Sequence, residues 1–195
     1  GRKYLSAIYI DGELAVHLDT RVVLEENVRA GKEITDERLK KLIDISNVRR
    51  AKEKALWLIS YRDHSKKELV QKIAKTADKE SAEIAVDRME ELGLVNDEKY
   101  ARRYLDQLIN IKHLSKNAAK YKLLEKGIDR NLIDEILCET ETDPQEHIRA
   151  IIERKYLKSL SDEKGKRRCF AGLQRMGYSY SDINSVLQEY IEDEY

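Results

Sequence analysis

The sequence contains few residues that break helices. One proline and eight glycines are spread over 195 residues, and phenylalanine and tryptophan occur once each. So few breakers exclude a fold assembled from many short strands and tight turns. Charged residues make up 38% of the chain, and Glu, Lys, Leu, Ala and Arg are abundant. This composition favours solvated helices, so we expect a mainly α-helical protein.

The sequence also lacks a net charge and a cysteine framework. The 37 basic residues balance 37 acidic ones, so no global field attracts the chain to DNA. Any role with nucleic acid must therefore come from local groups of charge. Cys138 and Cys169 stand apart, without the spacing of a disulfide framework or a metal site. We interpret them as buried thiols in a reducing compartment, and we predict neither metal nor cofactor.

Apolar runs and enzyme motifs are missing as well. No apolar run reaches about 18 residues, and the first residues show no signal-peptide pattern, so we predict a cytoplasmic protein without membrane contact. The sequence has no glycine-rich phosphate loop, no His-Glu-x-x-His and no Gly-x-Ser-x-Gly, and its four histidines are scattered. We therefore expect a binding protein with no catalytic residues.

The first residues predict a β-hairpin. Two strand-like runs, residues 4–10 and 13–18, flank Asp11-Gly12, a preferred two-residue hairpin turn. This turn predicts three facing pairs on one wholly apolar face: Tyr9 with Leu14, Ala7 with Val16, and Leu5 with Leu18. Short helices are predicted over residues 20–28 and from Thr35 onward. Residues 1–48 would then form a small cap of one hairpin and short helices.

The rest of the chain repeats with a period near fifty residues. Four positions match four others fifty residues later: Leu123, Gly127, Ile133 and Leu137 against Leu173, Gly177, Ile183 and Leu187. Each unit has room for three helices and is too small to be stable alone, so neighbouring units should stack. We expect tandem three-helix repeats over residues 49–97, 98–142 and 143–195, the last with an acidic tail. Stacking would give an elongated, curved solenoid.

Signals for helix ends support these boundaries. Gly93 suits the left-handed residue after a helix, and Asp97 is a candidate cap for the next one. Ser65 and Glu68 have the spacing of a capping box, and Pro144 fits a first helical turn. The glycine-then-apolar ending recurs at two later junctions, Gly127-Ile128 and Gly177-Tyr178.

Basic residues concentrate in the second helix of each unit. Residues 112–130 hold six basic and two acidic residues, whereas residues 131–148 hold six acids and no Lys or Arg. These cations are either ordinary helix solvation or a basic ridge for phosphates or an acidic protein groove. We expect Lys116 and Lys120 to be exposed, so that replacing them leaves the fold intact. The candidate partner-binding residues are Lys66, Lys67, Lys72, Arg102, Arg103, Lys112, Lys116, Lys120, Lys122, Lys164, Lys166, Arg167 and Arg168.

An ordered set of segments resembles the RecX family, bacterial regulators of the RecA recombinase built from tandem three-helix repeats. The segments are residues 55–60 (ALWLIS), 65–69 (SKKEL), 93–101 (GLVNDEKYA), 123–128 (LLEKGI) and 173–179 (LQRMGYS). The resemblance covers about residues 50–190, and the hairpin start is similar to that of longer members. The sequence departs from the family at Ser115, where many members have glycine.

The resemblance implies a regulator of recombination and DNA repair within the SOS response. Its partner would be the RecA filament on single-stranded DNA, whose recombinase and ATPase activities it would modulate, chiefly by inhibition. The chain would act as a monomeric wedge in the filament groove, with direct DNA contact as a weak addition. The alternatives are a DNA-binding helix-turn-helix regulator and an interaction scaffold without nucleic acid. Neutral charge and the lack of a dimerisation stripe weigh against the first alternative.

Overall fold

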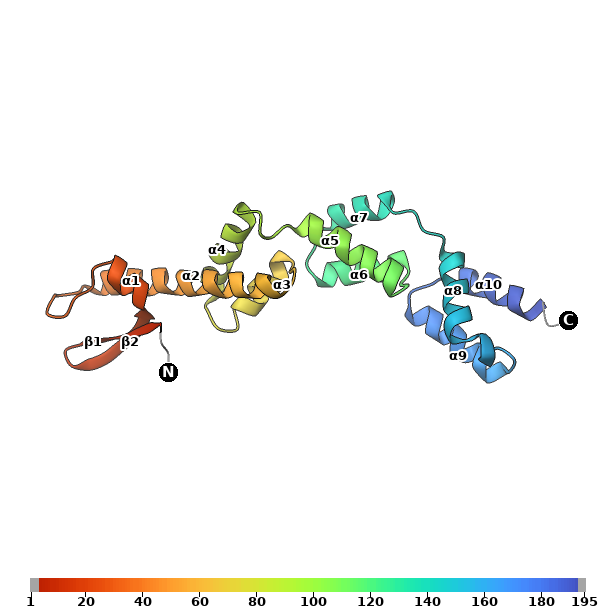
Figure 1. The fold of residues 1–195 in the computed structure, drawn as a ribbon, viewed down its shortest axis with the longest axis horizontal. Helices are drawn as coiled ribbons and strands as arrows, with labels where there is room; N and C mark the ends of the chain where they lie inside the picture. Colours follow the sequence, from red (N-terminus) through yellow and green to blue (C-terminus); the bar gives the residue numbers. More distant parts are fainter. Residues whose placement is uncertain (1–3, 193–195) are drawn as a thin grey trace. The chain divides into compact units, whose positions relative to one another are not determined.

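The computed structural model describes the backbone of residues 4–192 and the side chains of residues 4–190. This part of the chain is mainly α-helical and has one two-stranded sheet near the N-terminus (Figure 1). The chain divides into two compact units, residues 1–96 and residues 97–195. The predicted helical class and the N-terminal hairpin are confirmed, while the curved solenoid stays a prediction.

The hairpin consists of β1 (Leu5–Ile10) and β2 (Glu13–Asp19), which pair antiparallel. Asp11 and Gly12 connect them with φ angles of 51° and 88°. Two positive φ angles are the signature of the tight turn that suits the twist of a hairpin. The turn predicted from Asp11-Gly12 is therefore confirmed.

The predicted hairpin register is correct only next to the turn. Tyr9 faces Leu14 as predicted, but the register then shifts and Ile8 faces Val16, so that Ala15 is the extra residue of a bulge. The predicted pairs Ala7 with Val16 and Leu5 with Leu18 are therefore wrong. The predicted apolar face is wrong as well. Its members Tyr9 and Leu14 are 64% and 51% exposed, because the bulge changes which side chains share a face.

Two helices cover the inner face of the hairpin. Helix α1 (Thr20–Glu25) is capped by the Asp19 carboxylate, and α2 (Asp36–Tyr61) is capped by the Thr35 hydroxyl. Leu18, Val22 and Leu42 form the buried centre of this region, and Ile8 and Val16 pack against it. Helix α2 runs without a break through residue 48, where we placed the end of the cap. One helix therefore contributes to both the cap and the first repeat.

The first repeat combines the second half of α2 with α3 (Lys66–Ile73) and α4 (Lys79–Glu91). Its core combines alanines of α2 and α4 with larger residues of α3, α4 and the segment after α4: Ala51, Ala55, Leu69, Ile73, Ala82, Ala85, Val86, Met89 and Val95. The Ser65 hydroxyl accepts a hydrogen bond from the Glu68 amide at 3.2 Å, which confirms the predicted cap. Gly93, with φ of 69°, ends α4 as predicted.

The second repeat consists of α5 (Asp97–Asp106), the π-helical turn η1 (Gln107–Ile111), α6 (Lys116–Glu125) and α7 (Arg130–Glu139). Leu105, Leu108, Leu123 and Ile133 lie in its core. Asp97 is the first residue of α5, so it is not the cap that we predicted. Its carboxylate still lies in the first turn, where the helix dipole favours an anion.

The third repeat consists of α8 (Pro144–Lys155), the 3-10 turn η2 (Leu157–Ser159), α9 (Glu163–Arg175) and α10 (Tyr180–Glu192). Pro144 opens α8 as predicted, behind an Asp143 cap. Two glycines of α9 allow η2 and the preceding Tyr156 to lie close to this helix. A Cβ at Gly165 would collide with the Ser159 carbonyl, and one at Gly172 would collide with the Tyr156 hydroxyl.

The second and third repeats contact each other directly at the start of α6. The Ser115 amide donates to the Met176 carbonyl at 3.0 Å. The Tyr178 hydroxyl donates to the His113 carbonyl at 2.8 Å. The end of α9 is thus hydrogen-bonded to the loop before α6, which fixes one repeat on the next.

Candidate partner-binding surface

Lys66 at the start of α3 holds its own repeat together. Its ammonium donates to the Glu90 carboxylate at 2.6 Å and lies 3.6 Å from Asp87. The hydrogen bond to Glu90 is the main reason that the pKa of Lys66 is raised. Both acids belong to α4, so this lysine links the second helix of the repeat to the third.

Lys116 occupies the equivalent place in the second repeat, fifty residues later. Its ammonium donates to the Leu137 carbonyl at 3.1 Å and also to the Thr140 carbonyl. These carbonyls lie at the C-terminal end of α7, where backbone acceptors have no partner within the helix. Lys120 on α6 is paired with Asp134 on α7. The prediction that both lysines are exposed is wrong, because both side chains lie across the α6–α7 contact and are only partly accessible.

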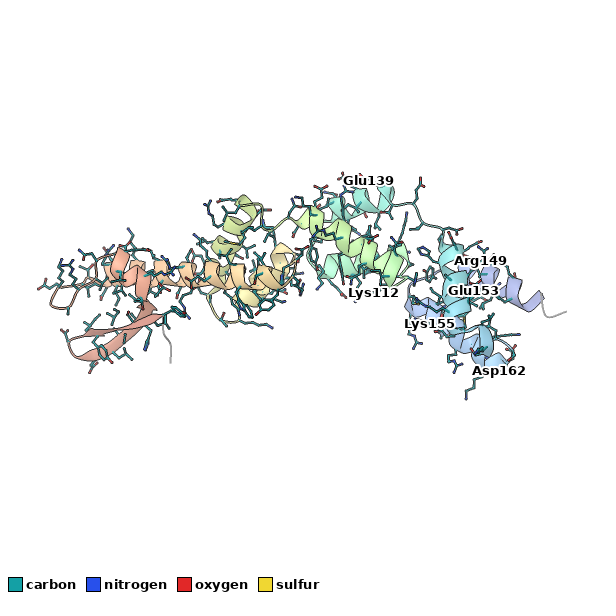
Figure 2. The ribbon with its side chains drawn as sticks, in the orientation of Figure 1. Lys112, Glu139, Arg149, Glu153, Lys155 and Asp162 are labelled. Atoms are coloured by element: carbon teal, nitrogen blue, oxygen red, sulfur yellow. The ribbon has the colours of Figure 1, made fainter. Side chains whose placement is uncertain are left out.

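Arg102 is also engaged within its repeat. Its guanidinium pairs with Glu139 at 2.5 Å and with Glu98 at 3.1 Å (Figure 2 labels Glu139). The hydrogen bond to Glu139 is the largest cause of its raised pKa. The pair joins α5 to the end of α7. Arg103, the next residue, is exposed on α5.

Three further candidates are paired with a residue on the same helix. Lys122 lies 2.9 Å from Glu125, and Lys166 lies 3.8 Å from Glu163. Lys72 lies 3.9 Å from Glu68 and 2.9 Å from the Nε2 atom of His64. Partly exposed pairs of this kind contribute little to stability and can exchange for a partner.

Five further candidates are exposed to solvent and form the open set. Among the described residues, none of these five has a salt bridge: Lys67, Lys112, Lys164, Arg167 and Arg168. The Lys112 ammonium instead lies 5.9 Å from the Tyr104 ring centroid. Lys112 is labelled in Figure 2. Apart from Arg103, the thirteen predicted residues thus divide into an internally bonded set of seven and an open set of five.

Three cations outside the predicted set lie at the end of α8 and in η2, the segment that packs on α9. Arg154, Lys155 and Lys158 are exposed at the end of α8 and in η2. The contact between Ser159 and Gly165 brings this segment to the first turn of α9. We call the combined set the third-repeat basic surface: Arg154, Lys155, Lys158, Lys164, Arg167 and Arg168. The signal for the added residues was in the sequence, because residues 149–175 hold nine basic and three acidic residues.

The electrostatic effect of these cations extends to the second repeat. The pKa of His113 is lowered, first by burial and then by the positive charges of Arg154, His147 and Lys155. The rings of His113 and His147 lie edge to face with centroids 5.9 Å apart. Two of these charges, Arg154 and Lys155, belong to the third-repeat basic surface.

The second unit contains a cavity and both cysteines. A cavity of about 350 Å³ lies at the contact between the second and third repeats, lined among others by Lys116, His147 and Asp182. Within residues 4–190, no group of three or more His, Cys, Asp or Glu side chains is arranged to hold a metal. Cys169 is buried, and burial raises its pKa to about 11. Cys138 is exposed on α7, so the prediction that both thiols are buried is wrong for this one.

Each of the three repeats matches a domain of a known protein family. The RecX first, second and third three-helix domains match residues 51–89, 96–137 and 141–187. The regulatory protein RecX of Clostridioides difficile is 30% identical over 96% of this chain and 91% of its own length. The chain belongs to the RecX family. The regulatory protein RecX of Clostridium tetani is 27% identical over 93% of this chain and 86% of its own length.

Solved RecX structures share the fold. The crystal structure of a regulatory protein RecX aligns over 95% of this chain and 93% of its own, with a TM-score of 0.66 and 21% identity. RecX from Lactobacillus salivarius aligns over 74% and 96%, with a TM-score of 0.60 and 23% identity. The tandem three-helix architecture predicted from the fifty-residue period is therefore that of the RecX fold. In the described part of this RecX-family chain, no helix is long and apolar enough to span a membrane.

Proposed function

We propose that this chain binds RecA filaments formed on single-stranded DNA and lowers their recombinase and ATPase activities. The observation that carries this proposal is membership of the RecX family, supported by a relative named "Regulatory protein RecX" that matches 96% of the chain. The protein would act by binding rather than by catalysis. The cytoplasmic location and the monomeric state predicted from the sequence belong to the same proposal.

The open cations are the residues proposed to touch the filament. The third-repeat basic surface would be the main contact, and Lys67 and Lys112 would supply further contacts on the first and second repeats. Separate exposed contacts on successive repeats suit a polymeric target, because each additional contact raises the effective concentration of the next. Lys66, Lys116, Lys120 and Arg102 are proposed to support the fold instead, since their charges are already bonded within their own repeats.

The experiment is an ATPase time course of RecA on single-stranded DNA with and without this chain. We expect the parent chain to slow the reaction, and the double variant Arg167→Glu with Arg168→Glu to slow it less. The matched control is Lys40→Glu with Lys41→Glu, which makes the same charge change on two adjacent exposed residues of α2. A parent chain without any effect on RecA would overturn the proposal. Equal inhibition by both double variants would remove the third-repeat basic surface from it.

The helix-turn-helix alternative predicts a different result. A direct DNA-binding regulator would bind naked duplex with a steep salt dependence and a strong sequence preference. Our proposal predicts only weak binding to duplex without RecA, because the 37 basic residues are offset by 37 acidic ones. Gel-shift titrations at two salt concentrations separate the two functions.

A further inference from the structure

Helix α2 carries an exposed stripe of cations and aromatic rings. Arg50, Lys54, Trp57 and Tyr61 are spaced by four, three and four residues, so they lie along one side of the helix. Trp57 is 50% exposed and Tyr61 is 70% exposed. From the first residue to the last the stripe spans about 16 Å, at about 1.5 Å per residue. We call these four residues the α2 stripe.

The aromatic rings of the stripe are ordered by contacts with each other. The Trp57 and Tyr61 ring centroids lie 4.8 Å apart with an angle of 67° between the ring planes. The Lys54 ammonium lies 3.9 Å from the Trp57 ring centroid, within the range of a cation–π contact. The core side of the same helical segment is built from Ala51 and Ala55, with Leu58 and Ile59 partly buried against it. Trp57 and Tyr61 lie outside this core set, so core packing does not explain them.

A shallow cavity adjoins the stripe. It has a volume of about 300 Å³ and is lined by Arg50 and Lys54, by Thr76 and Ala77, and by Tyr4, which is 76% exposed. Two carboxylates border it as well. Asp19 is buried and lies 3.6 Å from Arg49, and Glu53 is exposed at the rim. The Arg50 and Lys54 cations are not salt-bridged to either acid among the described residues.

We propose that the α2 stripe and its cavity bind single-stranded nucleic acid. Bases would stack on Trp57 and Tyr61, while Arg50 and Lys54, one to two helical turns before Trp57, would bind neighbouring phosphates. Exposed aromatic rings beside cations are the chemistry that recognises a strand whose base faces are open. Paired duplex hides those faces, so single strands are favoured over duplex.

A protein partner fits this surface less well. A stable protein interface covers about 800 Å² on each side. Four side chains in one row on a single helix offer a narrower contact. Two cations followed by two aromatic rings on one side of the helix match a polymer of phosphates and bases. The inference concerns binding without RecA, so it is independent of the proposed function.

Trp57 is the sole tryptophan of the chain, so its fluorescence reports this site directly. The first test titrates the full chain with oligo(dT) of about 15 nucleotides, within the range that such single-strand sites occupy. The control ligand is an abasic oligonucleotide of the same length and charge. We expect oligo(dT) to quench the emission and the abasic strand to leave it nearly unchanged. No quenching, or equal quenching by both ligands, overturns the proposal.

The second test measures affinity for a labelled oligo(dT) by fluorescence anisotropy. Trp57→Ala and Tyr61→Ala should each weaken binding roughly 5- to 150-fold, the range for loss of one stacked base. Trp57→Phe should retain most of the affinity, because it keeps an aromatic face. Tyr121→Ala is the matched control, since Tyr121 on α6 is 69% exposed. Far-UV circular dichroism checks that each variant is folded.

Two outcomes of the affinity series overturn the proposal. One is that Trp57→Ala and Tyr61→Ala bind as tightly as the Tyr121→Ala control. The other is that oligo(dT) does not bind the parent chain while Trp57→Ala reduces inhibition of RecA, which would make the stripe a protein contact. Neither oligonucleotide assay contains RecA, so their failure leaves the proposed regulation of RecA untouched.

Discussion

The hydroxyl of Ser115 donates a hydrogen bond to the carbonyl oxygen of Gly177 at 2.7 Å. The same hydroxyl accepts a hydrogen bond from the Ala118 amide at 3.2 Å and so caps α6. The family resemblance implies glycine at the position of Ser115. Here the backbones of the second and third repeats still approach closely, and the serine side chain adds a cap and a bond between repeats.

Replacing Gly177 should therefore lower the free energy of unfolding by more than the strain of its positive φ angle alone explains. Gly177 has φ of 88°, and a Cβ there would lie 2.5 Å from the Ser115 hydroxyl oxygen and 2.7 Å from the Ala118 Cβ. Gly93 is the matched control, because it has φ of 69° and no atom within 4 Å of a new Cβ. We expect Gly93→Ala to lower the free energy of unfolding by about 1–2 kcal/mol and Gly177→Ala by about 3 kcal/mol or more. Urea unfolding followed by circular dichroism measures both, and equal losses would contradict the close approach.

Two basic residues that look alike in the sequence should differ in their effect on stability. Lys116 bonds to the Leu137 and Thr140 carbonyls, whereas Lys67 is exposed and has no salt bridge among the described residues. Lys116→Ala should lower the free energy of unfolding by about 1–3 kcal/mol, because it removes charged hydrogen bonds to backbone oxygens. Lys67→Ala should change it by less than about 0.5 kcal/mol. Thermal or urea unfolding of the two variants gives the comparison, and similar values for both would show that Lys116 does not hold α7.

Stability of the first unit should decrease as the pH falls below about 6.5. His64 is buried, its Nδ1 lies 2.8 Å from the Arg62 carbonyl, and its Nε2 lies 2.9 Å from the Lys72 ammonium. Nδ1 must then carry the proton and Nε2 must accept, so the ring is neutral. Burial is the main cause that lowers the pKa of His64 from 6.5; the hydrogen bond to the Arg62 carbonyl opposes it, and the positive charges of Arg62 and Lys72 add to the lowering.

The sign of the effect follows from proton uptake. Because the pKa of His64 is lower in the folded state, the unfolded chain binds more protons in this range, and acid favours unfolding. The stabilisation is complete above pH 6.5 and is lost as the pH falls through the lowered pKa. Unfolding curves detected by Trp57 fluorescence report the first unit, which contains both residues. His64→Gln, which cannot titrate, should flatten the pH dependence, and an unchanged slope would exclude His64 as its source.

The two thiols should react at very different rates. Cys138 is exposed, whereas Cys169 is buried and has its pKa raised to about 11 by burial. Only the thiolate reacts with iodoacetamide or a disulfide reagent. We expect one thiol to be labelled rapidly at pH 8 and the second only when the third repeat opens. Mass spectrometry of the labelled peptides assigns the sites, and rapid labelling of Cys169 in the native chain would contradict its burial.

The parts that depend on a few neighbouring residues could be predicted from the sequence. The turn at Asp11-Gly12, the Ser65 cap, the Pro144 helix start and the glycine endings all follow from local backbone geometry. The fifty-residue period predicted the three-helix repeats for the same reason, since each repeat places its caps and core residues at the same offsets. The basic character of the third repeat could also be predicted, because it is a matter of composition.

Only the tertiary structure decided which cations are open to a partner. Lys67 and Lys116 both follow a serine cap closely in the sequence. Lys116 donates a hydrogen bond to the carbonyl of Leu137, more than twenty residues away, whereas Lys67 is exposed. The bulge in the hairpin and the outward position of Trp57 likewise depend on how distant elements pack. Helical spacing sets which residues share a face. Whether that face is buried, salt-bridged or open to solvent depends on which distant segments of the chain pack against it.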